Sequence, residues 1–154
     1  VAQTLARTFF ELGCVAIRPN FRGVGGTEGL HDEGRGETDD TVAVGKVALS
    51  HYGELPLFLA GFSFGGFVQA QVAKVLPCRK LVLIAPAVGR FPVGQVPADT
   101  LVIHGELDET VPLQAALDWA RPQELPIVVV PGADHFFHRR LQIIRDLVKA
   151  SCRF

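Results

Sequence analysis

The sequence predicts an open α/β fold, in which a mostly parallel sheet carries helices on both of its faces. Short runs rich in Val, Ile and Leu recur along the chain, and they are continuous rather than alternating. Such runs are typical of strands that are buried on both faces of a parallel sheet. Segments with apolar residues at helical spacing lie between these runs, and this alternation of strands and helices predicts the fold class.

Five apolar runs are the predicted strands: Cys14–Ile17, Leu57–Ala60, Leu81–Ile84, Leu101–Ile103 and Ile127–Val130. The predicted helices are Val1–Leu12, a second helix capped by Thr38, and then Gly65–Leu76, Leu113–Ala120 and Phe136–Ala150. Thr38 is chosen as the cap because Asp39 and Asp40 would follow in the first turn, where carboxylates suit the helix dipole.

The glycine-dense stretch Arg22–Gly36 is predicted to be a mobile loop. Glycine-rich turns also bind the phosphates of dinucleotides, but Gly23–Glu28 does not give the pattern GxGxxG at the start of a helix. The acidic residue expected about twenty positions further on is absent as well. The sequence therefore argues against a dinucleotide site.

Bulk properties predict one ordinary globular domain over residues 1–154. The chain is 48% hydrophobic and 20% charged, and its net charge of −1 argues against nucleic acid or an anionic membrane as the main partner. The longest apolar stretch, residues 55–68, is interrupted by Pro and Gly and is shorter than the roughly 18 to 20 residues that a bilayer span needs. No membrane association is therefore expected.

Three cysteines, Cys14, Cys78 and Cys152, show no metal-binding or disulfide spacing. Free thiols are typical of a reducing compartment, so we expect a cytoplasmic protein without a metal site. The sequence begins at Val1, already in a helical pattern, and contains no Met. This start suggests a fragment, and a signal peptide would be lost with the missing part.

The segment Gly61-Phe62-Ser63-Phe64-Gly65 has the pattern GxSxG. It directly follows one predicted strand and opens a predicted helix, which is the setting of a nucleophile elbow. Glycine at 61 and 65 would remove clashes in this sharp turn, and Gly66 would extend that relief. We therefore predict Ser63 as a nucleophile, with the N–H of Phe64 as one donor of an oxyanion hole. The structural alternative is a simple Gly-Ser turn that caps a helix.

A serine hydroxyl needs a base, and the base needs a partner that orients it. His135 follows the strand Ile127–Val130, and Asp108 follows the strand Leu101–Ile103, each at the carboxyl end where open α/β sheets place their sites. His138 is an alternative base, and Glu106 is an alternative acid. Asp134 is too close in sequence to His135 to orient its ring. His104 lies at a strand end, where a role in the core or in support of the site is expected.

These motifs resemble those of the α/β-hydrolase superfamily, in particular its small bacterial members without a large lid, related to dienelactone hydrolases and esterases. Arg18–Thr27 resembles the family loop D-x-R-G-x-G-x-S, and Gly61–Gly66 resembles its elbow. His104–Pro112 resembles the acid loop HG-x-x-D-x-x-VP, and Pro131–Phe137 resembles the base loop G-A-x-H-x-F. Dienelactone hydrolases use cysteine as nucleophile, so Ser63 points to ordinary ester chemistry.

The resemblance also implies that the sheet is incomplete at its N-terminal side. The family sheet runs in the order 1-2-4-3-5-6-7-8, and its third strand would lie between Cys14–Arg18 and Leu57–Gly61. The first three strands would precede Val1, in about 50 to 70 further residues. These residues would also supply the second oxyanion donor.

The function expected from these residues is hydrolysis of small carboxylic esters or related acyl compounds through a Ser63–His135–Asp108 triad, with no cofactor. Pro86–Thr100 is too short for a cap domain, so the site is expected to be open to solvent. An apolar acyl pocket could use the phenylalanines at positions 62, 64, 67, 136 and 137, although such aromatics are more often core. The alternative is a non-catalytic binding or scaffold protein on the same fold. The sequence leaves substrate and oligomeric state open.

Overall fold

The computed structural model describes residues 1–23, 29–53 and 55–153. Within them, a parallel sheet runs in the order β1-β2-β3-β4, and each strand pairs with its neighbour in this list. The strands are β1 (Phe58–Phe62), β2 (Lys80–Ile84), β3 (Leu101–Gly105) and β4 (Val128–Val130). The predicted class, an open parallel sheet in an α/β fold, is confirmed.

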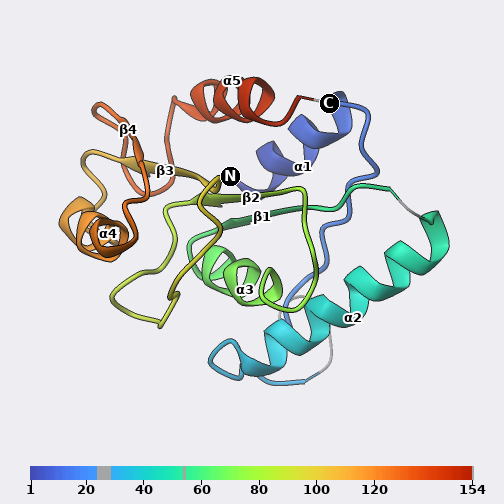
Figure 1. Cartoon of the computed structure of the whole chain (residues 1–154). Coiled ribbons are helices and arrows are strands. Elements are labelled where there is room, and N and C mark those ends of the chain that lie inside the picture. The colour runs from blue at the N-terminus through green and yellow to red at the C-terminus, as the bar shows by residue number, and fades with distance from the viewer. Residues whose placement is uncertain (24–28, 54, 154) are drawn as a thin grey trace.

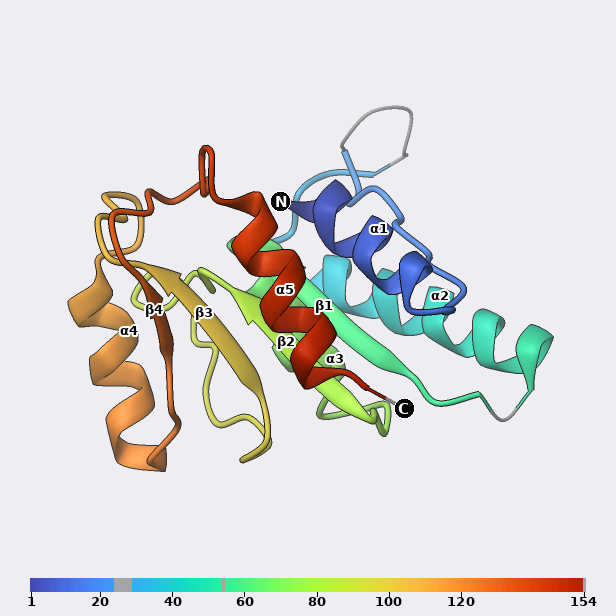
Figure 2. The ribbon, with the colours of Figure 1, turned by 90° about the horizontal axis from the view of Figure 1, so that it is seen from above.

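Helices cover both faces of this sheet (Figure 1). One face carries α1 (Ala2–Glu11) and α5 (Leu141–Ser151), which lie side by side in both views of the ribbon (Figure 2). The other face carries α2 (Arg35–Tyr52), α3 (Phe64–Val72) and α4 (Leu113–Ala120), which is followed by a short 3₁₀ turn, Arg121–Gln123.

The strands are apolar on both sides because each face packs against its own helices. Leu81, Leu83 and Val102 belong to the core under α3 and α4, whereas the alternate residues Val82, Ile84 and Ile103 belong to the core under α1 and α5. Full burial of such a side chain contributes about 1.5 to 3 kcal/mol each. This two-sided burial explains why the strands read as continuous apolar runs in the sequence.

The predicted strand over Cys14–Ile17 is wrong. Residues 14–20 follow α1 but join no sheet, because no described strand lies beside them to supply a hydrogen-bond ladder. A groove of about 540 Å³ lies between this segment and β1, and we refer to it as the β1 groove. The two segments therefore do not pair directly, and a strand between them stays a prediction.

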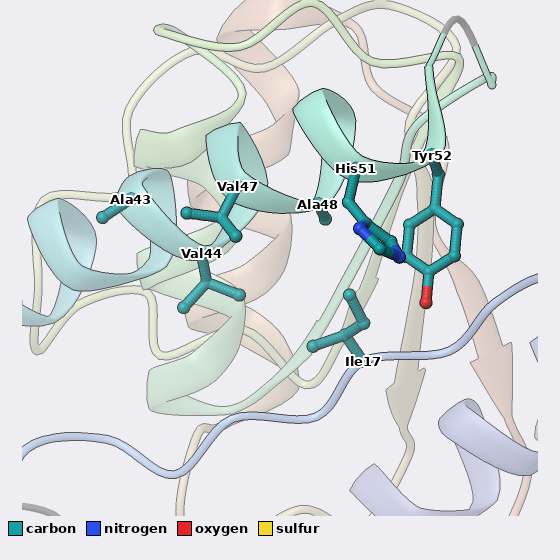
Figure 3. Close-up of a pocket in the computed structure, with 7 residues that line it drawn as sticks. All are labelled: Ile17, Ala43, Val44, Val47, Ala48, His51 and Tyr52. Atoms are coloured by element: carbon teal, nitrogen blue, oxygen red, sulfur yellow. The ribbon is translucent and has the colours of Figure 1, made fainter.

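Apolar side chains of residues 14–20 are left in contact with solvent. Val15 is 52% exposed and Ile17 is 51% exposed. Figure 3 shows Ile17 opposite Val44 and Val47 of α2, at the wall of a second, shallower hollow. This side of the molecule is thus less well packed than the side formed by β2, β3 and β4.

The start of α2 differs from the prediction. The helix begins at Arg35, so Thr38 lies inside its first turn, and Gly34 is the cap with φ of 92°. The carboxylate of Glu37 accepts the N–H of Gly34 at 3.1 Å, which replaces the predicted side-chain cap. Residues 24–28 of the predicted mobile stretch lie outside the described residues, but its end is an ordered helix start.

Two further helix boundaries were predicted wrongly. α5 begins at Leu141 rather than at Phe136, because Phe137 and Arg139 have φ of 55° and 63°, which an α-helix does not allow. α3 ends at Val72 rather than at Leu76, and turns follow it. None of the helices in the described residues has the length and hydropathy that a bilayer crossing requires.

Candidate active site

Ser63 lies in a tight turn between β1 and α3. Its backbone has φ of 55° and ψ of −117°, a conformation that non-glycine residues rarely adopt and that stores strain. The turn is held by backbone hydrogen bonds, since the Ser63 N–H donates to the Ile84 carbonyl at 2.9 Å and the Ser63 carbonyl accepts the Ala87 N–H at 3.1 Å. The end of β2 therefore helps to fix the predicted nucleophile.

Two of the three glycines of this turn have the role that the sequence predicted. A Cβ at Gly61 would lie 2.3 Å from the Gly65 carbonyl oxygen, so no other residue fits without a backbone shift. A Cβ at Gly66 would lie 3.2 Å from Pro86, which is also tight. Gly65, however, would meet only the Phe21 ring at 3.7 Å, an ordinary contact. The prediction that Gly65 is required by space is therefore wrong, and Gly61 and Gly66 are the constrained positions.

His135 lies in the loop after β4, with its ring directed at Ser63. Its Nε2 is 3.0 Å from Ser63 Oγ, and its Nδ1 is 2.7 Å from Asp108 Oδ2. Because a carboxylate only accepts, Nδ1 carries the proton and Nε2 is free to accept the Ser63 hydroxyl proton. The side chain is buried, and its hydrogen bond to Asp108 lies away from bulk water, whereas the bond to Ser63 is partly buried.

Asp108 is held in place by the backbone of its own loop. Its Oδ1 accepts the N–H groups of Thr110 at 2.9 Å and Val111 at 2.7 Å, which leaves Oδ2 for His135. The carboxylate is fully buried, and three donors together offset the cost of burying its charge. The three predicted residues are thus joined by two hydrogen bonds, although the bonded pairs are 72 and 27 positions apart in sequence.

The alternative residues from the sequence have other partners. The Glu106 carboxylate accepts the N–H of Gly132 at 2.8 Å and is exposed. Asp134 accepts from the His138 ring, which lowers the pKa of Asp134 below its usual value. Glu106 therefore links the acid loop to the base loop at the surface, whereas Asp134 is bonded within the base loop, and the geometry favours Asp108 and His135.

Comparison with known proteins identifies the family of the chain. No family model matches the sequence. Among solved structures, a serine hydrolase without a lid from Xanthomonas campestris is 40% identical, with a TM-score of 0.90 over 97% of this chain and 70% of that one. A serine hydrolase homologue from Coxiella burnetii is 38% identical, with a TM-score of 0.87 over 95% of this chain and 73% of that one.

The chain belongs to the α/β serine hydrolases. A curated relative, an uncharacterized protein of Rickettsia prowazekii, is 26% identical over 92% of this chain. The chain spans 66% of the length of that protein. The family resemblance that the sequence motifs predicted is confirmed.

In this α/β serine hydrolase the Phe64 N–H lies at the start of α3. The first N–H groups of a helix have no acceptor within it, and the helix dipole favours negative charge there. This position suits one donor of an oxyanion hole, and the predicted second donor before Val1 stays a prediction.

Residues 85–100, between β2 and β3, are all described and contain only an isolated bridge between Val88 and Phe91.

The five phenylalanines that the sequence proposed for an acyl pocket lie in three different settings. Phe67 and Phe137 are buried in the two cores. Phe62 and Phe136 flank the His135 ring, with ring centroids 4.9 and 5.0 Å away. Phe64 packs edge-on against Phe21 and Phe91. Phe62 and the half-exposed Phe136 are therefore the aromatic side chains nearest the base.

Sequence reasoning missed the role of Glu37. Its carboxylate has no exposed surface and accepts the N–H groups of Asp32 and Gly34, while His31 lies 3.0 Å away. Burial alone would raise the pKa of Glu37, but these N–H donors and His31 outweigh it, so that the pKa lies below its usual value of 4.5. The spacing of Gly34 and Glu37 fits a capping box, but a glycine at the cap hides the signal.

We refer to Glu37 and the N–H groups of Asp32 and Gly34 that it accepts as the Glu37 clamp. His31 connects this clamp to the nucleophile turn. The His31 ring lies 5.1 Å from the ring of Phe64, the residue after Ser63. Glu37 therefore contacts a ring that packs against the residue after the nucleophile. Within the described residues, no group of three or more His, Cys, Asp and Glu side chains converges as metal ligands would.

Proposed function

We propose that this protein hydrolyses small carboxylic esters, or related acyl compounds, with Ser63 as nucleophile, His135 as base and Asp108 as acid. The observation that carries the proposal is the pair of hydrogen bonds from Ser63 Oγ to His135 Nε2 and from His135 Nδ1 to Asp108 Oδ2. Membership of the α/β serine hydrolases supports it.

In the first half of the proposed reaction, Ser63 Oγ attacks the ester carbonyl while His135 Nε2 takes the hydroxyl proton. The carbonyl oxygen becomes an oxyanion, and the Phe64 N–H at the start of α3 stabilises it. The C–O bond to the alcohol then breaks, and His135 returns the proton to the departing alcohol. An acyl group remains on Ser63.

In the second half, a water molecule attacks the acyl carbonyl and gives its proton to His135. The bond to Ser63 Oγ breaks, the serine regains its proton from His135, and the carboxylic acid leaves. Asp108 holds the imidazole with its proton on Nδ1 throughout and stabilises the charged ring. Only neutral His135 accepts a proton, so the rate should rise as the solution becomes less acidic.

The test is hydrolysis of p-nitrophenyl acetate and butyrate by the purified protein. Ser63→Ala should lower kcat/KM by about 10³-fold or more, as the loss of a triad member does in other serine hydrolases. Ser50→Ala, an exposed serine on α2, is the matched control and should keep normal turnover. A wild-type protein without turnover would instead support a binding or scaffold role, and a folded Ser63→Ala variant with normal turnover would reject Ser63.

A further inference from the structure

His104 is a fully buried imidazole at the carboxyl end of β3 that the proposed mechanism does not use. It lies four residues before Asp108, at the start of the acid loop. The strand end is packed closely against the base loop, since a Cβ at Gly105 would lie 2.5 Å from the Ala133 carbonyl oxygen. A side chain at this point can therefore affect both loops of the site.

The hydrogen bonds of His104 fix where its proton lies. Its Nε2 is 2.7 Å from the Val111 carbonyl oxygen, and a carbonyl only accepts, so Nε2 carries the proton. Its Nδ1 is buried and has no partner among the described residues. A second proton on Nδ1 would bury a charged ring with an unpaired N–H, which is costly. His104 is therefore a neutral ring with its proton on Nε2.

Val111 connects this ring to the acid. The carbonyl of Val111 accepts from His104, while the N–H of the same residue donates to Asp108 Oδ1 at 2.7 Å. The Nε2 of His104 also lies 3.5 Å from Asp108 Oδ2, the oxygen that accepts from His135. The ring thus fixes the end of the acid loop and lies beside the catalytically relevant oxygen.

We infer that His104 is a positioning residue for the acid, which acts by donating its Nε2–H to Val111 and so holding the loop that orients Asp108. This inference rests on the proposed function. The side chain needs only a donor at the position of Nε2, because Nδ1 has no partner.

Three substitutions separate the donor from the volume of the ring. The amide nitrogen of glutamine can occupy the position of Nε2, whereas that of asparagine reaches only the position of Nδ1. His104→Gln should therefore keep most of the activity, and His104→Asn and His104→Leu should lower kcat by up to about 10²-fold with KM unchanged. If His104→Leu fails to fold, the glutamine and asparagine variants carry the comparison, and equal kcat in these two variants would overturn the inference.

A double-mutant cycle distinguishes positioning from general support of the fold. In an Asp108→Asn background the acid no longer acts as a carboxylate, so His104→Asn should cause no further loss of kcat. A loss of the same factor in both backgrounds would mean that His104 acts independently of Asp108, and the inference would be wrong.

A third measurement does not depend on activity. The ¹⁵N NMR spectrum of histidine-labelled protein distinguishes the two neutral tautomers, and His104→Gln identifies the signal. We expect a neutral ring with its proton on Nε2 at pH 7, and a proton on Nδ1 would overturn the inference. If the wild-type protein shows no ester hydrolysis, the proposed function fails, while this spectrum still tests the geometry of His104.

Discussion

The carboxyl ends of the strands and the β1 groove lie at different edges of the same sheet. Polar groups at the carboxyl ends have hydrogen-bond partners, whereas polar and apolar groups at the groove are left without full pairing or packing. At the site, Asp108 accepts three hydrogen bonds and both ring nitrogens of His135 have partners. At the groove, β1 pairs on one side only among the described strands, and Val15 and Ile17 are half-exposed. The Oε1 atom of Gln69, which lines the groove, is buried without a partner among the described residues.

This difference shows which part of the chain sets the geometry of the site. The nucleophile, acid and base come from the loops after β1, β3 and β4, and these strands are linked through β2. The segment 14–19 contributes neither a strand of the described sheet nor one of these three residues. We therefore expect the site to be sensitive to small changes near β3 and β4, and insensitive to similar changes at the groove.

The largest effect is expected at the acid. Asp108→Asn should lower kcat by about 10⁴-fold, because an amide stabilises the wrong tautomer of His135 and cannot offset its positive charge. Glu106→Gln changes the neighbouring acidic side chain in the same way and should retain most of the turnover, since the Glu106 carboxylate bonds to the Gly132 N–H and not to His135. If kcat falls in Glu106→Gln and stays normal in Asp108→Asn, the acid is misassigned.

A matched pair of isoleucines tests the packing of the two regions. Ile103 in β3 is fully buried, so Ile103→Ala should lower the free energy of unfolding by about 2 to 5 kcal/mol. Ile17 borders the groove and is 51% exposed, so Ile17→Ala should change the free energy of unfolding by only about 0.5 kcal/mol. Urea unfolding, followed by circular dichroism, measures both. A large loss at Ile17 would mean that the groove is covered in the protein in solution.

A smaller loss than that at Ile103 is expected at Glu37, beside the elbow. Glu37→Gln places an amide where N–H donors converge and should lower the free energy of unfolding by about 1 to 3 kcal/mol at pH 7. Because the folded state lowers the pKa of Glu37, its stabilisation is complete above the usual value of 4.5 and is lost as the pH falls further.

The pH dependence of thermal unfolding checks this sign. The difference in Tm between wild-type protein and Glu37→Gln should shrink as the pH falls below about 4.5. The exposed Glu33→Gln is the control and should leave Tm unchanged at every pH. A difference in Tm that grows toward low pH would contradict the claim that the ionised carboxylate of Glu37 stabilises the folded state.

The sequence was sufficient for the fold class and for the three residues that the structure brings together. Continuous apolar runs identified β1 to β4, and the order of Ser63, Asp108 and His135 after strands placed them at one edge of the sheet. These features depend on local patterns and on the geometry of parallel strands, which a single sequence reveals.

Other features depend on contacts that no local pattern reveals. Cys14–Ile17 has the composition of a strand, but a strand also needs a neighbour, and none of the described strands lies beside it. The start of α5 depends on positive φ angles at Phe137 and Arg139. For His104 the sequence predicted a role in the core or in support of the site, but not its partner, the Val111 carbonyl seven residues away. Tertiary contacts decide each of these features.

Labelling with a fluorophosphonate probe tests most directly whether Ser63, His135 and Asp108 act together. Such probes react with a serine only when its hydroxyl is activated, so the purified protein should be labelled once, on the peptide that contains Ser63, as determined by mass spectrometry. His135→Ala should abolish the labelling, and His138→Ala should leave it unchanged. Labelling at another serine, or undiminished labelling of a folded His135→Ala variant, would contradict the proposed site.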